Sequence, residues 1–365
     1  MFFLARKNLF QEKTRLLISV GGVAFSVALI TVLAGLYQGW SNKIGEYIRT
    51  VPADIWVLQL GTENMFHTPS VLPLGEQTAI ENVEGVASVQ PFSARRLTSE
   101  SNGLDLYVVA YDAVNDSGKP ARVVKGSPLP GPGEIIVDNS QSKKVKIGQF
   151  IDIAGQQFRI VGLAEGGDLV SSSFAFVAKE ELDKIQQLPD QTNYFLVSTK
   201  PGFGVNAVID NIKKDISKVN AVTSDEFADN NTAIIKDNFL PVIFILVLIG
   251  IAVGIAVIGL TIFTSTIEKS KEYGVLKAIG LKNLQLYGIV IKQALVAGVI
   301  GFVIGVGLAV ALGEVVGGYV PQFVSQVRLF DAAWIFALTV VMSVLAAFIP
   351  IRRLAHIDPA EVFKS

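Results

Sequence analysis

Glu268-Lys-Ser-Lys-Glu-Tyr-Gly-Val-Leu-Lys-Ala-Ile-Gly280 is a charged stretch that stands between two long apolar segments of the chain. Its residues have the spacing of a helix, and Gly280 stands where a glycine commonly ends one. A short charged helix between two membrane spans lies at the membrane surface, where it can meet a partner. The stretch therefore predicts a membrane protein that another protein drives from the cytoplasm.

The composition of the 365-residue chain also indicates a membrane protein. Apolar residues make up 50% of the chain and charged residues 17%, a balance unusual for a soluble domain. The net charge of −1 argues against nucleic acid as a partner. The chain has no cysteine, which excludes disulfides, thiol catalysis, and thiolate zinc or iron–sulfur sites.

Four apolar segments have about the length that a helix needs to cross a bilayer. The predicted transmembrane helices are 16–37, 239–264, 286–312 and 332–350, the last of them ending at Pro350. The first segment is longer than the apolar core of a signal peptide, and no small-x-small cleavage site follows it. We therefore interpret it as an uncleaved span.

Basic residues in the short flanking segments predict the orientation. The loop 265–285 contains four lysines, whereas the loop 313–331 contains one basic residue, Arg328. The positive-inside rule then places the amphipathic N-terminal segment 1–15, the loop 265–285 and the tail 351–365 in the cytoplasm. The loop 313–331 becomes a short external loop.

The segment 38–238 has a different character from the spans. It is polar, interrupted by proline and glycine, and contains short strand-like runs such as Glu134-Ile-Ile-Val137. Its ends, 38–50 and 225–238, are predicted to be helical extensions of the spans. The predicted fold is an α-helical four-span bundle with a large extracytoplasmic α+β domain inserted between the first and second spans.

Two glycine pairs lie within the spans, Gly250-x-x-x-Gly254 and Gly301-x-x-x-Gly305. Small residues at this spacing allow two helices to approach closely. The close approach can occur within the chain or between two subunits, and the spacing alone leaves both open.

The loop and the C-terminal tail together resemble two motifs of the FtsX-like, MacB-type permease subunits of ABC systems (type VII). The segments 82–89 and 146–162 are also similar to the external core domain of that family, with Gln149 in place of the commoner aspartate. In the loop, Glu272, Gly274, Lys277, Ala278 and Gly280 match, and Leu276 is typical of its variable position. In the tail, the matching residues, which we expect to be structural, are Pro350, Ala355, Asp358, Pro359 and Val362.

The resemblance implies that the helix 268–279 is a coupling helix, which receives the movement of a partner ABC ATPase. Its apolar face would consist of Tyr273, Val275, Leu276 and Ile279. The predicted ATPase-coupling residues are Glu268, Lys271, Glu272, Tyr273, Gly274, Leu276, Lys277, Ala278 and Gly280. The alternative is an ordinary amphipathic helix whose lysines face lipid headgroups.

No G-x-x-x-x-G-K-S/T loop occurs in the sequence, so we expect ATP and Mg to bind the partner ATPase and no cofactor to bind this chain. The resemblance further implies a bacterial cytoplasmic membrane and a second permease copy, as a homodimer or with a similar chain. A periplasmic adaptor or lipoprotein and membrane lipid are further expected partners.

The function that the resemblance implies is mechanotransmission, in which ATPase movement reaches the external domain through the helices. The spans lack the ionisable residues of an aqueous path, which favours a lipophilic substrate: a lipid, lipoprotein, peptide, drug or haem. The alternative is a non-transporting subunit that regulates an external cell-wall hydrolase or other partner; the size of the insert favours transport. A membrane enzyme is disfavoured, because the sequence predicts no catalytic or metal-binding set.

The outer end of the first span is the predicted substrate-binding region, with Tyr37, Trp40 and Glu46. The alternative for the two aromatic residues is an interfacial belt, which is their usual role at this depth.

Overall fold

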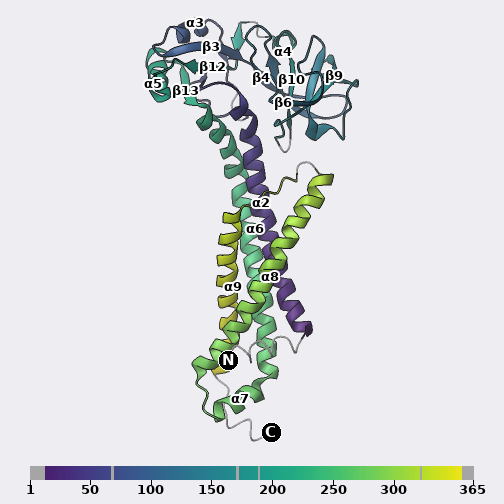
Figure 1. Ribbon diagram of the computed structural model, residues 1–365, viewed down its shortest axis with the longest axis vertical. Helices are drawn as coiled ribbons and strands as arrows, with labels where there is room; N and C mark the ends of the chain where they lie inside the picture. The colour runs from purple at the N-terminus through teal and green to yellow at the C-terminus, as the bar shows by residue number, and fades with distance from the viewer. Residues whose placement is uncertain (1–12, 67–69, 170–171, 188–189, 321–322, 356–365) are drawn as a thin grey trace. The chain divides into compact units, whose positions relative to one another are not determined.

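The computed structural model describes residues 13–66, 70–169, 172–187, 190–320 and 323–355 (Figure 1). The chain forms two compact units. The first, which we call the membrane unit, consists of 1–39 and 238–365, and the second, the inserted unit, consists of 40–237. The sequence had predicted an inserted domain over 38–238.

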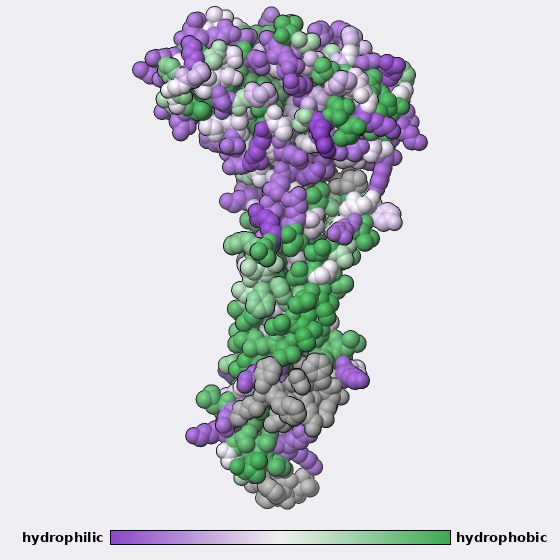
Figure 2. Space-filling view, viewed as in Figure 1, coloured by the Kyte–Doolittle hydropathy of each residue, from purple (hydrophilic) through white to green (hydrophobic). Residues whose placement is uncertain are grey.

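Four helices are long and apolar enough to cross a membrane. They are α2 (Lys13–Thr50), α6 (Ser224–Glu268), α8 (Asn283–Tyr319) and α9 (Leu329–Ala355), and a short helix, α7 (Ser270–Ala278), lies between α6 and α8. Helices α2 and α6 both continue beyond their apolar segments into the inserted unit, over 40–50 and 224–237. Figure 2 shows hydrophobic residues over the middle of the long helices on the visible face of the membrane unit, as expected for helices that face lipid.

Helix α9 corrects one prediction, because it does not end at Pro350 but continues to Ala355. A proline inside a helix cannot donate to the carbonyl four residues earlier, here that of Ala346. The residues after Pro350 compensate by packing, since Leu354 is buried in the hydrophobic core of the membrane unit. Gly259 of α6 leaves room for the Ala346 oxygen, which lies 3.3 Å from the position of a Cβ on that glycine.

The two glycine pairs pack within the chain, mainly against α2. A Cβ on Gly301 would lie 2.5 Å from Val23 Cβ, and one on Gly305 would lie 2.7 Å from the Ala24 carbonyl oxygen. A Cβ on Gly254 would lie 3.2 Å from Ser26 Oγ. Gly301 and Gly305 need glycine because α2 passes too close for any side chain. A Cβ on Gly250 would make only an ordinary contact with Ile30 at 3.4 Å, and one on Gly254 would first meet Met342 of α9.

The inserted unit is an α+β domain with three sheets. A four-stranded antiparallel sheet has the order β13-β1-β12-β3, a seven-stranded sheet has the order β4-β5-β10-β7-β9-β6 with β8 paired to β9, and β11 pairs with β2. Helices α3 and α5 cover the four-stranded sheet, and α4 packs on β5 and β10 of the seven-stranded sheet. The strands are β1 (Ile55–Gln59), β2 (Leu72–Pro73), β3 (Val86–Phe92), β4 (Ala94–Thr98), β5 (Asp105–Tyr111), β6 (Arg122–Gly126), β7 (Glu134–Asp138), β8 (Phe150–Ile153), β9 (Gln156–Glu165), β10 (Ser173–Ala178), β11 (Gln191–Thr192), β12 (Tyr194–Thr199) and β13 (Val219–Thr223). The helices are α3 (Glu76–Glu81), η1 (Asn139–Gln141), α4 (Lys179–Gln186) and α5 (Val205–Asp215).

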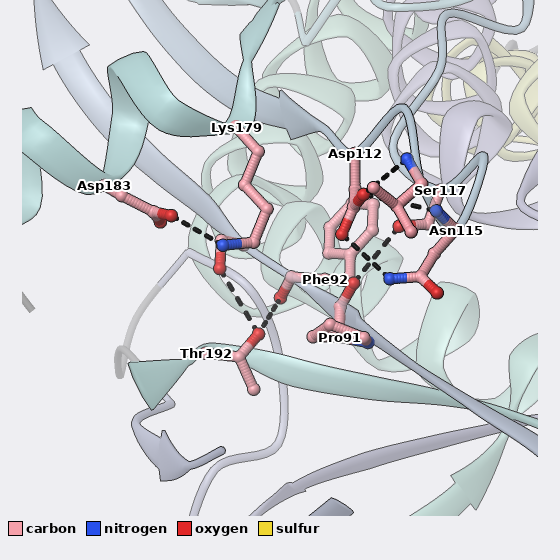
Figure 3. A network of polar contacts seen from close by, with 10 residues as sticks. Pro91, Phe92, Asp112, Asn115, Ser117, Lys179, Asp183 and Thr192 are labelled. Atoms are coloured by element: carbon pink, nitrogen blue, oxygen red, sulfur yellow. Dashed lines mark hydrogen bonds and ion pairs between the residues drawn. The ribbon is translucent and has the colours of Figure 1, made fainter. Parts of the chain in front are cut away.

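A polar network joins the two larger sheets where the chain crosses from β3 to β4 (Figure 3). Thr192 Oγ1 lies 3.0 Å from the Phe92 carbonyl oxygen and 3.2 Å from Ser93 Oγ. Ser117 Oγ donates to the Pro91 carbonyl oxygen at 3.2 Å. These buried bonds fix the crossing point, so the relative position of the sheets within the unit is defined by hydrogen bonds as well as by packing.

Each helical extension is anchored to a different sheet of the inserted unit. The Tyr47 ring of α2 lies 4.5 Å from the ring of Phe174 on β10 of the seven-stranded sheet. The Phe227 ring of α6 lies 4.8 Å from the ring of Trp56 on β1 of the four-stranded sheet. All four side chains are buried. Because they are closely packed, a movement of either extension would be transmitted directly to the sheet that it contacts.

Candidate functional site

The charged stretch 268–280 forms the turn that connects α6 to α8. Glu268 is the last residue of α6, Lys269 departs from helical geometry with φ −91° and ψ 13°, and α7 then runs from Ser270 to Ala278. The predicted helix over 268–279 is thus divided, because Glu268 belongs to α6 and the helix is interrupted at Lys269. The consequence is that α7 is separated from α6 by a break of a single residue.

Gly280 ends α7 as the sequence predicts. Its φ of +100° lies in the left-handed region that favours glycine. The Gly280 N–H donates to Lys277 O at 3.0 Å and the Leu281 N–H donates to Leu276 O at 3.0 Å, which is the Schellman pattern. Leu276 and Leu281 both pack against the core of the membrane unit, so the cap also fixes the direction in which the chain leaves α7.

One side of α7 is packed on the membrane unit and the other is exposed. Tyr273 is 3% exposed and Gly274 is buried, whereas Val275 is 44% and Ile279 is 70% exposed. The predicted single apolar face is therefore wrong, because Tyr273 and Leu276 face the core while the other two apolar residues do not. We call the exposed set the α7 outer face; it consists of Lys271, Glu272, Val275, Ala278 and Ile279.

Lys277 lies between α7 and the end of α9. Its Nζ donates to the carbonyl oxygens of Leu354 at 2.9 Å and of Ala355 at 3.3 Å. An ammonium group at this position satisfies carbonyls that have no partner within the helix, and it complements the negative end of the helix dipole. The predicted ATPase contact of Lys277 is untested, but its charge already has an internal role.

Glu268 forms an ion pair with Arg15 of α2. The Glu268 side chain is more than half exposed, so the pair adds little stability, although it does place the end of α6 beside α2. The sequence did not reveal these two partnerships, because Arg15 and the end of α9 are far from the loop along the chain.

Part of the predicted tail motif can be placed. Pro350 is buried within α9 and Ala355 is its last residue. Asp358, Pro359 and Val362 lie outside the described residues, as does most of the segment 1–15.

The predicted substrate-binding residues Tyr37, Trp40 and Glu46 all lie on α2, and their role stays a prediction. The Glu46 carboxylate faces the loop at Gly166, with Oε1 3.8 Å from the position of a Cβ on that glycine. Among the residues that the structure describes, no three histidine or acidic side chains lie together as metal ligands would.

Two family models match the chain. The FtsX-like permease C-terminal model matches residues 244–359, and the MacB-like periplasmic core domain model matches residues 16–215. The first match includes α7 and all of α9, and the second begins in α2 and covers most of the inserted unit.

Individual relatives agree with these matches. An uncharacterized ABC transporter permease of Methanocaldococcus jannaschii is 24% identical over 99% of this chain and 96% of that protein. The macrolide export ATP-binding/permease protein MacB of Wolinella succinogenes is 21% identical over 99% of this chain and 60% of that protein. Among solved structures, the periplasmic region of MacB from Actinobacillus actinomycetemcomitans aligns with a TM-score of 0.35 and 15% identity, over 50% of this chain and 94% of that one.

Proposed function

Since this chain belongs to the MacB/FtsX-type family of ABC transporter permeases, we propose that it couples ATP hydrolysis by a partner ATPase to the export or extraction of a lipophilic substrate. The observation that carries this proposal is the α7 outer face. It presents Lys271 and Glu272 beside exposed Val275 and Ile279, while the opposite side of the helix is packed on the membrane unit. Mixed charged and apolar surface on a firmly held helix suits a protein contact.

The internal contacts of α7 support a role in transmitting movement. Tyr273 is buried in the core of the membrane unit, and Lys277 bonds to the end of α9. A force applied to the outer face therefore acts on the helix bundle through packed and hydrogen-bonded contacts. Helices α2 and α6 continue into the inserted unit, where Tyr47 and Phe227 anchor them to its sheets. This is the route that we propose for mechanotransmission.

The ATPase is proposed to be a separate chain in a cell with a bacterial cytoplasmic membrane. The 365 residues contain no phosphate-binding loop of the G-x-x-x-x-G-K-S/T type. The longer Wolinella relative combines ATP-binding and permease functions in its name, and this chain aligns with only 60% of it. In this arrangement α7 and both termini face the ATPase in the cytoplasm, and a second permease copy completes the transporter.

A lipophilic substrate fits the composition of the spans. Lys292 is the only charged residue within the four predicted segments, so they do not provide the polar path that a hydrophilic solute would need. Export agrees with the name of the Wolinella relative, a macrolide export protein. A subunit that only regulates an external partner would use the same coupling surface, so transport must be measured separately.

The coupling proposal is tested with Val275→Glu and Glu272→Arg on the α7 outer face, each co-expressed with the partner ATPase. We expect the tagged permease to recover at least fivefold less ATPase. Each substitution should weaken the binding free energy between permease and ATPase by about 1 kcal/mol or more. Val114→Glu, at a position 92% exposed in the inserted unit, is the matched control and should recover the normal amount. Normal recovery and normal ATPase stimulation by both α7 variants would refute the proposal.

The same preparation distinguishes transport from regulation. Reconstituted in vesicles, a transporter should release or move a lipophilic probe in an ATP-dependent way, whereas a regulatory subunit should couple to the ATPase without moving any probe.

A further inference from the structure

The inserted unit contains a cavity of about 370 Å³ that the proposed coupling does not use. We propose that it is a binding site for a small amphipathic molecule, one that carries an acidic group on an apolar body. The volume lies within the range of about 300–1,000 Å³ that is usual for small-molecule sites.

The cavity lies where several parts of the inserted unit meet. Tyr107 comes from β5 of the seven-stranded sheet, Tyr194 from β12 of the four-stranded sheet, and Gln186 from the end of α4. Met65 lies on the connection that follows β1. Because the walls come from separate elements, the shape of the cavity depends on the complete fold of the unit, as is usual for ligand sites.

The polar groups that line the cavity include two donors without an internal acceptor. Among the described residues, Arg95 has no ion-pair or hydrogen-bond partner, whereas its neighbour Arg96 donates to both oxygens of Asp105. Gln186 Nε2 is buried and has no hydrogen-bond partner among the described residues. A buried donor normally has a partner, so Gln186 Nε2 indicates a ligand with an acceptor oxygen. Arg95 is exposed at the same cavity, and its guanidinium favours an anionic ligand.

The remaining lining suits the apolar part of such a ligand. Met65, Phe66 and Val71 contribute apolar side chains. The rings of Phe66 and Tyr107 are 5.3 Å apart in an edge-to-face arrangement. An aromatic or aliphatic body can pack against these side chains while the acidic group reaches Arg95.

Hydrogen bonds hold the wall at Met65 in place without a ligand. Tyr107 Oη donates to the Met65 carbonyl oxygen at 2.8 Å, and the Met65 N–H donates to Asn231 Oδ1 at 2.8 Å. Burial raises the pKa of the Tyr107 phenol, which keeps it protonated as a donor at physiological pH. The wall is therefore preformed, which lowers the entropy cost of binding.

The test introduces single cysteines into the cysteine-free 365-residue chain, which is reconstituted in lipid nanodiscs. Val71→Cys, on the cavity wall and 36% exposed, is modified with the anionic reagent sulfonatoethyl methanethiosulfonate, and the rate is followed as phenylbutyrate is added. We expect saturable slowing of the modification. Leu60→Cys, which is 64% exposed and outside the cavity, should react at a rate that phenylbutyrate does not change.

Two further substitutions, each added separately to the Val71→Cys variant, test the chemistry of the site. Adding Arg95→Gln to Val71→Cys should raise the half-protecting concentration of phenylbutyrate about tenfold, because the cation that pairs with the carboxylate is lost. Adding Arg122→Gln, an exposed arginine outside the cavity, should leave it unchanged. Phenylbutanol, which lacks the acidic group, should protect about tenfold more weakly. Absence of saturable protection, or equal protection with Arg95→Gln, would overturn the proposal.

Discussion

At the scale of single residues, glycines set the distance between α2 and α8. Gly301 and Gly305 both face α2, and in each case the Cβ of any other residue would meet α2 at less than an ordinary van der Waals distance. Gly307 lies on the same helix with nothing within 4 Å of its Cβ position. The helix therefore contains a glycine that packing requires and, two residues on, one that packing does not.

This difference gives the first prediction. Gly305→Ala should lower the free energy of unfolding by about 1–3 kcal/mol, because its methyl group would overlap the Ala24 carbonyl oxygen and Val27. Gly307→Ala should be neutral or stabilising by up to about 1 kcal/mol, since alanine is the better helix former. Thermal unfolding of the two variants in nanodiscs checks this. Equal melting temperatures would contradict the assigned packing of α2 on α8.

At the scale of elements, the Lys277 side chain hydrogen-bonds α7 to α9. The Lys277 ammonium lies on the last carbonyls of α9, whereas Lys271, six residues earlier, is exposed on the outer face. The two lysines thus have different tasks although they belong to the same short helix. One connects elements within the protein, and the other belongs to the proposed ATPase contact.

The second prediction separates these tasks. Lys277→Met should speed amide hydrogen exchange in the last turn of α9, residues 351–355, by about fivefold, which corresponds to about 1 kcal/mol of lost hydrogen bonding. Lys271→Met should leave that exchange unchanged and instead weaken ATPase recovery. If exchange in 351–355 is the same in both variants, Lys277 does not stabilise the end of α9.

The sequence predicted some of these elements better than others. Apolar length predicts the four long helices, and Gly280 predicts the end of α7, because each depends on local chemistry alone. The orientation of α7 could not be predicted, since Tyr273 and Val275 are both apolar and tertiary contacts decide which is buried. The prediction that the fourth helix ends at Pro350 failed for the same reason, because packing of Leu354 keeps α9 helical beyond the proline. The cavity has no local signal at all, because its walls come from separate segments.

At the scale of the whole molecule, two compact units are formed by one chain that leaves the membrane unit at Gly39 and returns to it at Asn238. The termini and α7 are proposed to share one side of the membrane, and the inserted unit the other. This topology is inferred from the distribution of basic residues, and it can be tested directly in cells.

The third prediction concerns this topology. In the cysteine-free chain, Val114→Cys should react with a membrane-impermeant maleimide in intact cells, because Val114 is 92% exposed on the inserted unit. Lys271→Cys, on the α7 outer face, should react only after the membrane is permeabilised. The reverse pattern would place the inserted unit in the cytoplasm and exclude the proposed ATPase contact.

The backbone of Met65 has a further consequence. Its N–H is held by Asn231 of α6 and its carbonyl by Tyr107 of β5, and its side chain lines the cavity. A displacement of this part of α6 would therefore change the affinity of the cavity for the proposed ligand. Thermodynamic reciprocity requires the converse: a bound molecule must bias the position of α6 by the same factor. Occupancy of the cavity and the position of α6 are then thermodynamically coupled, so a change in either one changes the other.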